Sequence, residues 1–170
     1  MGGGACKLVV GNTEVGIEAK FKDAVYPRLI SPSDSIRELF GFGIDDTSVR
    51  IGACCPLSTI QHECEISGAD PALTRTLMPM HDMLRWFAST QIRNVVCLGG
   101  NLVTASPISD MNPMLPSMGA TLVLSSLVVK GQILRRQVKF ADFFLPYRTV
   151  ILKPTDVVAC LALPRLSSLL

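Results

Sequence analysis

Two short turns constrain this sequence most, because each follows an apolar run and ends it with glycine and asparagine. The first turn is Gly11-Asn12 and the second is Gly99-Gly100-Asn101. Glycine permits positive φ and lets another group approach the backbone closely. Successive backbone N–H groups in such turns can form a concavity that binds an anion. Two turns of this kind in one chain predict a ligand with phosphate groups, held from two sides.

Each turn also has a simpler interpretation, which the turn residues alone leave open. Gly11-Asn12 is compatible with a plain hairpin turn, and Gly99-Gly100 is compatible with a glycine-rich linker. Under the ligand interpretation we expect Gly100 at positive φ, so that Gly100→Val would abolish ligand binding. We also expect the carboxylate of Glu14 to point away from the first turn or to cap the local backbone, because it would repel a phosphate.

The composition is that of a globular protein and argues against several functions. Hydrophobic residues make up 48% of the chain, charged residues make up 18%, and the formal net charge is +2; this is not the composition of a disordered chain. Scattered basic residues and few aromatic residues argue against a nucleic-acid site. No apolar stretch reaches the roughly 20 residues of a membrane span, and no signal peptide is recognisable. We therefore expect a cytoplasmic protein with no nucleic-acid or membrane partner.

The six cysteines predict buried free thiols. Their spacing contains no C-x-x-C pair and fits neither a zinc site nor an iron–sulfur cluster. Most of them lie among apolar neighbours, where a free cysteine behaves as a small buried hydrophobe. A chain without a secretory signal is also an improbable place for disulfides. His62 and His81 are too widely separated for a metal centre, so no metal ligand is predicted.

Apolar patterning predicts a small α/β lobe in the first part of the chain. A short helix is expected at residues 35–40, capped by Asp34 or Ser35. A break rich in glycine and aspartate follows this helix. The expected strands are residues 8–10, 17–21, 28–30 and 49–51.

The second part of the chain predicts helices followed by an antiparallel sheet, with the lobe boundary near residues 51–56. Pro56 suits the first turn of a helix, Asp70-Pro71 is expected to be a turn, and Pro79 is expected near the start of a helix that carries Trp86 in the core. Residues 91–98 are compatible with a helix or a buried extended run. The expected helices are residues 56–64, 77–87 and 110–118, and the expected strands are 121–129, 132–140 (a hairpin turning at Lys130-Gly131) and 157–163.

Longer strings around both turns resemble the FAD-binding domain of xanthine dehydrogenases, in the molybdenum hydroxylase family. Residues 8–18 (LVVGNTEVGIE) resemble the family's first flavin-binding loop. The strings LRWFA, QIRNV, GGN and ASPISD, between residues 84 and 110, resemble the second loop, and FF at 143–144 with YR at 147–148 resembles a later landmark. The motifs occur in the family's order from Lys7 to about Pro164. They are closer to xanthine dehydrogenase than to aldehyde oxidase.

The resemblance implies an α+β fold, the two-lobed FAD-binding domain of the vanillyl-alcohol-oxidase/PCMH type. A small α/β lobe would be residues 1–55, a lobe of helices and antiparallel sheet would be residues 56–164, and residues 165–170 would be an unrelated tail. This fold holds FAD without a Rossmann loop, in agreement with the absence of Gly-x-Gly-x-x-Gly from the sequence. Compared with the family, the chain lacks a helix before Lys7 and a further subdomain after Pro164.

The resemblance also implies a set of FAD contacts and no catalytic residue. Backbone N–H groups of the first turn would bind the pyrophosphate, and hydrogen bonds to a charged acceptor are worth roughly 1.5–3 kcal/mol each. Phe87 would lie against the flavin ring, with a core position as its alternative, and Asp110 would accept hydrogen bonds from ribityl or ribose hydroxyls. The implied contacts are Leu8, Val9, Val10, Gly11, Asn12, Thr13, Glu14, Val15, Phe87, Cys97, Leu98, Gly99, Gly100, Asn101, Thr104, Ser109, Asp110 and Val158.

The function implied by the resemblance is an electron relay in a larger oxidoreductase. Electrons from a purine oxidised at molybdenum would pass through iron–sulfur clusters to FAD, and the flavin would reduce NAD or oxygen. The clusters and the molybdenum cofactor would belong to other domains, in cis or in trans, of an enzyme that could be a homodimer. The alternatives are a separate flavin subunit of a multi-chain molybdenum hydroxylase and a truncated non-catalytic remnant. Alone, the chain is expected to be inactive and to bind FAD weakly or not at all.

Overall fold

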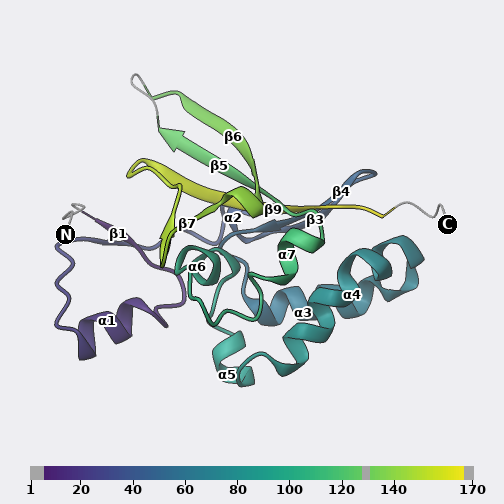
Figure 1. The fold of residues 1–170 in the computed structure, drawn as a ribbon, viewed down its shortest axis with the longest axis horizontal. Helices are drawn as coiled ribbons and strands as arrows, with labels where there is room; N and C mark the ends of the chain where they lie inside the picture. The colour runs from purple at the N-terminus through teal and green to yellow at the C-terminus, as the bar shows by residue number, and fades with distance from the viewer. Residues whose placement is uncertain (1–5, 128–130, 167–170) are drawn as a thin grey trace.

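The computed structural model describes residues 6–127 and 131–166 of the chain. In this part the protein has a small lobe near the N-terminus and a larger lobe in which helices lie under one face of a five-stranded sheet (Figure 1). The predicted α+β architecture is therefore confirmed. Among the described residues, no helix is both long and apolar enough to cross a membrane.

The small lobe is a pair of parallel strands joined through a helix. β1 (Lys7–Leu8) pairs with β2 (Leu29–Ile30), and α1 (Val15–Phe21) lies in the connection between them. The strand expected at residues 17–21 is wrong, because these residues belong to α1. Parallel strands need a crossover connection, which is usually helical. Glu18 in the first turn and Lys20 in the last turn also complement the helix dipole.

The sheet of the larger lobe is antiparallel throughout, with the strand order β3-β4-β9-β5-β6. The predicted hairpin of β5 and β6 is confirmed, although Lys130 of its expected turn lies outside the described residues. Gly131 of that turn has φ +78°. The strands are β3 (Phe42–Ile44), β4 (Ser48–Gly52), β5 (Thr121–Leu127), β6 (Ile133–Lys139) and β9 (Asp156–Pro164).

Two strands of this sheet, β3 and β4, precede the lobe boundary that the sequence places near residues 51–56. β4 pairs with β9 along its whole length. The preceding helix α2 (Arg37–Phe40) packs closely on β4, since a Cβ added to Gly52 would lie 2.2 Å from the carbonyl oxygen of Leu39. These contacts favour a boundary between β2 and α2.

Several helices lie under the sheet (Figure 1). Asp70 caps α4, because its carboxylate accepts hydrogen bonds from the N–H groups of Ala72 and Leu73. The turn expected at Asp70-Pro71 is therefore the start of a helix, and Pro79 lies well inside that helix and not near its start. The helices are α3 (Leu57–Ile66), η1 (Ser67–Ala69), α4 (Pro71–Trp86), α5 (Thr90–Arg93), α6 (Leu98–Val103) and α7 (Met114–Ser117).

Other local expectations need smaller corrections. Ile36 occupies the N-cap position of α2 without a side-chain cap, so a cap at Asp34 or Ser35 is wrong. Residues 91–98 are neither one helix nor one strand, because the chain leaves α5 through a turn and then enters α6. Residues 110–118 are α-helical only in α7. The sequence also missed η2 (Phe140–Asp142) and the short hairpin of β7 (Phe144–Leu145) and β8 (Thr149–Val150).

The main core lies between the helices and the sheet. In α4 the inward side chains Leu73, Leu77, Met80 and Leu84 repeat at the spacing of one helix face. Trp86, which the sequence analysis places in the core, is 86% exposed. It lies two residues beyond Leu84, and residues so spaced do not share a helix face.

Candidate functional site

The first turn lies directly against the segment that leads to the second turn. A Cβ added to Gly11 would lie 1.7 Å from the carbonyl oxygen of Val95 and 3.2 Å from the backbone nitrogen of Val96. No side chain fits this space, so glycine is needed here because two backbones approach closely. The tertiary structure thereby brings the two regions of the predicted site together.

The first turn presents backbone donors beside this contact. Asn12 has φ +56°, in the left-handed region. Within the described residues, no protein acceptor is found for the N–H groups of residues 12–15, whereas the N–H of Gly16 donates to the carbonyl oxygen of Asn12 at 3.1 Å. The carboxylate of Glu14 lies 3.9 Å from the ammonium of Lys22, which offsets its charge. Consecutive free N–H groups around a left-handed residue form a concavity suited to an anion.

The second turn lies inside a helix. Gly99 and Gly100 belong to α6, and Cys97 is the N-cap of that helix. The positive φ expected at Gly100 is wrong, because among the described residues the glycines with positive φ are found elsewhere. The left-handed residue of this region is Ala105, with φ +48°, just after α6.

Gly99 is needed for packing against the end of β4. Its N–H donates to the carbonyl oxygen of Ala53 at 2.6 Å, and an added Cβ would lie 2.8 Å from the Cβ of Ala53. The neighbouring N–H of Leu98 donates to the carbonyl oxygen of Cys55 at 3.1 Å. The N–H of Leu57 donates to the carbonyl oxygen of Val96 at 3.0 Å. These bonds hold the start of α6 in place beside the first turn.

Cys97 connects the two turns through its sulfur. Its side chain is buried, and the Sγ atom accepts a hydrogen bond from the N–H of Gly100 at 3.4 Å. Burial raises the pKa of the Cys97 thiol, and the nearby backbone N–H groups, that of Gly100 first, act in the opposite direction. A protonated thiol therefore lies where the two glycine turns meet.

Polar side chains near the second turn are partly engaged with one another. The Oγ of Ser109 lies 3.4 Å from Oδ1 of Asn101 and accepts the N–H of Asn112 at 3.2 Å. The hydroxyl of Thr104 donates to a backbone carbonyl of α6 at 2.8 Å, and Asp110 is exposed. Asn112 is not among the predicted contacts, yet its Oδ1 is buried without a partner among the described residues. A buried amide oxygen normally accepts a hydrogen bond, so this atom could accept one from a ligand. In the sequence, however, nothing distinguishes Asn112 from an ordinary loop asparagine.

The other predicted contacts differ in their burial and in their relation to the core. Phe87 follows the last residue of α4, is half-buried and packs against the main core, so both of its interpretations are compatible with the structure. Val158 lies in β9 and is 6% exposed. Leu8 is exposed, and Val9, Val10, Thr13 and Val15 are half-buried.

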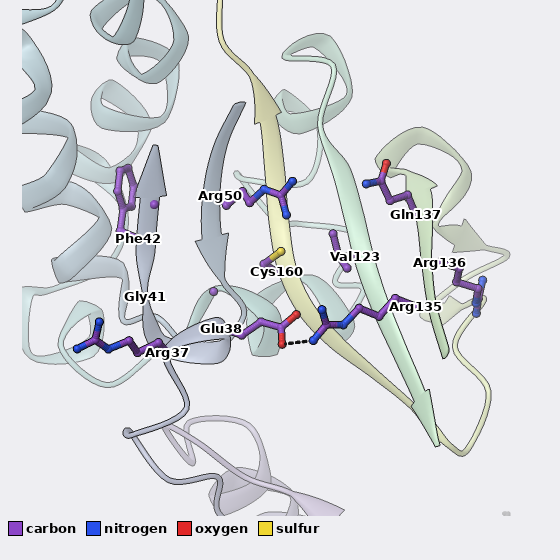
Figure 2. A pocket seen from close by; sticks show the side chains of 12 residues that line it. Arg37, Glu38, Gly41, Phe42, Arg50, Val123, Arg135, Arg136, Gln137 and Cys160 are labelled. Atoms are coloured by element: carbon purple, nitrogen blue, oxygen red, sulfur yellow. Dashed lines mark hydrogen bonds and ion pairs between the residues drawn. The ribbon is translucent and has the colours of Figure 1, made fainter. Parts of the chain in front are cut away.

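A separate cavity of about 710 Å³ lies on the other face of the sheet, away from α3 and α4 (Figure 2). An ion pair of 2.7 Å between Glu38 and Arg135 crosses this cavity. Three further arginines line it: Arg50 and Arg136 are also paired with carboxylates, whereas Arg37 has no ion pair among the described residues. The cavity contains none of the predicted FAD contacts, and three of its four guanidinium groups are paired with carboxylates, so we do not assign the phosphates to it.

The thiols give a direct test of the packing around the second turn. Cys54, Cys55, Cys64, Cys97 and Cys160 are buried and free, whereas Cys6 is exposed. With Ellman's reagent at pH 8, we expect one thiol of the native chain to react fast. The other thiols should react only after the chain is unfolded in denaturant. Two or more fast thiols would contradict the packing described here, and a Cys6→Ser variant should remove the fast phase.

The same thiols give a pH dependence of stability. Burial raises the pKa of Cys55 and of Cys64 from 9.0 to about 12. Above pH 9 an unfolded chain loses these protons while the folded chain keeps them, so the free energy of unfolding falls as pH rises. Urea unfolding at pH 8 and pH 10 should show this decrease, and equal stability at both values would contradict it.

The fold and the site define the class of protein: a two-lobed domain in which two glycine turns approach each other and present donors suited to a phosphate group. The family model described as "FAD binding domain in molybdopterin dehydrogenase" matches residues 2–166. The chain belongs to this family. It is 45% identical over 157 residues to the xanthine dehydrogenase of Drosophila subobscura, covering 91% of this chain and 12% of that protein. It is 41% identical over 160 residues to the xanthine dehydrogenase/oxidase of Gallus gallus, covering 93% of this chain and 11% of that protein.

Solved structures support the same fold. A carbon monoxide dehydrogenase from Hydrogenophaga pseudoflava aligns with a TM-score of 0.80 at 23% identity, covering 98% of this chain and 53% of that chain. Quinoline 2-oxidoreductase from Pseudomonas putida 86 aligns with a TM-score of 0.75 at 19% identity, covering 95% of this chain and 52% of that chain. At these identities the likeness shows the fold alone. FAD is thus the cofactor of the family to which this chain belongs.

Proposed function

We propose that this chain holds FAD between its lobes, with the pyrophosphate on the first turn and the start of α6 beside it. The carrying observation is the contact of Gly11 with Val95, which places four free N–H groups, those of residues 12–15, next to the second turn. Anionic phosphate oxygens are the acceptors that such groups bind best. The donors present therefore fit the cofactor of the family.

The remaining predicted contacts have distinct roles in this proposal. Phe87 borders the flavin ring and excludes water from it, and Val158 contributes an apolar contact from β9. Asp110 accepts hydrogen bonds from ribityl or ribose hydroxyls, which its exposure permits. Bound FAD supplies the acceptance and donation of electrons, while this chain supplies placement and electrostatics.

The larger function is an extension of this binding role. The relatives named above are xanthine dehydrogenases, and this chain spans 12% of the length of the Drosophila subobscura protein. We propose that it serves a xanthine dehydrogenase-like oxidoreductase, in which FAD takes electrons from iron–sulfur clusters and passes them to NAD or oxygen. Other domains, in cis or in trans, would hold the clusters and molybdenum. Because these relatives are named xanthine dehydrogenases, we propose a purine as the substrate of the larger enzyme.

Titration of the purified chain with FAD, followed by quenching of flavin fluorescence, tests the proposal. We expect saturable binding of about one FAD per chain, with a weak dissociation constant in the micromolar range or above. Competition by ADP, which shares the pyrophosphate, should release the flavin. Saturable binding that ADP does not compete would contradict the placement of the pyrophosphate, and the absence of saturation would contradict FAD binding by this chain alone.

A further inference from the structure

A single arginine closes the C-terminal end of the longest described helix. Nη1 of Arg93 donates to the carbonyl oxygens of Phe87, at 2.7 Å, and of Ala88, at 2.8 Å. Its Nη2 donates to Oγ1 of Thr90 at 3.2 Å. The last carbonyls of a helix have no partner within the helix, and a cationic side chain can satisfy them. Arg93 therefore fixes the backbone at Phe87 and just after it.

The backbone held by Arg93 has an unfavourable conformation. Ala88 has φ +44°, in the left-handed region that residues with a Cβ seldom adopt. Without the two hydrogen bonds to Arg93, little in the local sequence favours this turn. Arg93 also bonds the carbonyl of Phe87 itself, so losing the guanidinium would free the backbone that carries the Phe87 side chain.

The guanidinium is also partly removed from water. Nε of Arg93 is buried and has no partner among the described residues. Burying a donor that has no acceptor costs free energy. The hydrogen bonds that Nη1 and Nη2 make offset part of this cost. The planar guanidinium presents its donors in a rigid fork, which a lysine cannot reproduce.

Arg93 lies between the parts of the proposed FAD site along the chain. Two residues after it comes Val95, whose carbonyl oxygen meets Gly11, and four residues after it comes Cys97, which caps α6. The side chain of Arg93 thus binds the Phe87 turn, while its backbone leads directly to both glycine turns. The flavin ring and the pyrophosphate of FAD are covalently linked, so they can lie only a limited distance apart. The distance between Phe87 and the glycine turns must therefore match the distance between these two groups.

We infer that Arg93 is a positioning residue that sets Phe87 at the correct distance from the two glycine turns. It thereby favours FAD over nucleotides that have the pyrophosphate but lack the flavin ring. This inference rests on the proposed function, in which Phe87 borders the ring. Arg93 itself is not among the predicted FAD contacts, and of the residues that its side chain bonds, Phe87 is one of those contacts whereas Ala88 and Thr90 are not.

The test compares the affinity for FAD with the affinity for ADP in the full chain. In Arg93→Gln we expect the FAD affinity to fall about tenfold, roughly the effect of one lost charge-assisted hydrogen bond, while the ADP affinity changes by less than about twofold. The absorbance spectrum of the remaining bound flavin should shift, because the ring environment changes. Arg93→Lys, which keeps the charge without the fork, should recover part of the FAD affinity. Arg75→Gln, at an exposed arginine of α4, is the matched control and should change neither affinity.

The outcomes separate the inference from the proposed function. Equal losses of FAD and ADP affinity in Arg93→Gln, or no loss of either, would overturn the inference and leave FAD binding intact. If Arg93→Gln does not fold, the FAD-to-ADP ratio of Arg93→Lys decides by the same criterion. A wild-type chain that binds neither nucleotide would overturn the proposed function and the inference with it.

Discussion

Gly11→Ala is expected to lower the affinity for FAD about a hundredfold or more, which corresponds to ~2.8 kcal/mol. The added Cβ would lie 1.7 Å from the carbonyl oxygen of Val95 and 2.6 Å from its carbonyl carbon. Backbone atoms cannot rotate out of the way as a flexible side chain can, so the two turns must separate. The free N–H groups of residues 12–15 would then lose their position relative to α6.

The measurement is the FAD titration described above, with Gly43→Ala as the control. A Cβ at Gly43 would have no heavy atom within 4 Å, so that variant should bind like the wild type. Circular dichroism should show that the larger lobe of Gly11→Ala remains folded, because its core does not include position 11. Unchanged FAD affinity in Gly11→Ala would refute the assignment of the first turn.

Phe143→Ala is expected to destabilise the chain by about 3–5 kcal/mol, the usual cost of truncating a buried aromatic residue. Phe143 is fully buried in the main core. Its ring stacks on Phe140 at 6.1 Å between centroids and meets Phe144 edge-on at 5.2 Å. Truncation would open a cavity among three aromatic rings at the end of the sheet, where little can collapse to fill it.

Urea denaturation followed by circular dichroism measures this loss. Phe21→Ala is the matched control, because Phe21 is 70% exposed on α1 and should change stability by no more than about 0.5 kcal/mol. Similar stabilities of the two variants would show that the aromatic cluster contributes little. If Phe143→Ala has no secondary structure even in the absence of urea, its loss of stability is larger than we expect.

Local sequence patterns predicted the elements whose formation depends on nearby residues. The β5–β6 hairpin is such a case, because the apolar runs on both sides of Gly131 define it. Another case is the helix at Leu57–Ile66, which is predicted by Pro56 at its start and by the helical spacing of its apolar residues. The buried thiols of Cys54, Cys55 and Cys97 also follow from their largely apolar neighbours.

Patterns with two local solutions were decided by distant parts of the chain. Residues 17–21 alternate like a strand, but they form α1 because β1 and β2 are parallel and need a crossover. Asp70-Pro71 has the composition of a turn and of a helix start, and the helix is chosen because α4 has an apolar face to bury. Trp86 is exposed because that face turns away from it.

The sequence by itself determined which family motifs are present and the α+β architecture, and it predicted which residues would bind a phosphate group. Only the tertiary structure decided why the glycines are needed. Gly100 lies in a helix, and Gly11 is required because Val95, more than eighty residues away in sequence, occupies the space of its side chain. Likewise, only the fold places Arg93 on the carbonyls of Phe87 and Ala88. Such contacts depend on how backbones approach in space, and no local pattern of side chains encodes that distance.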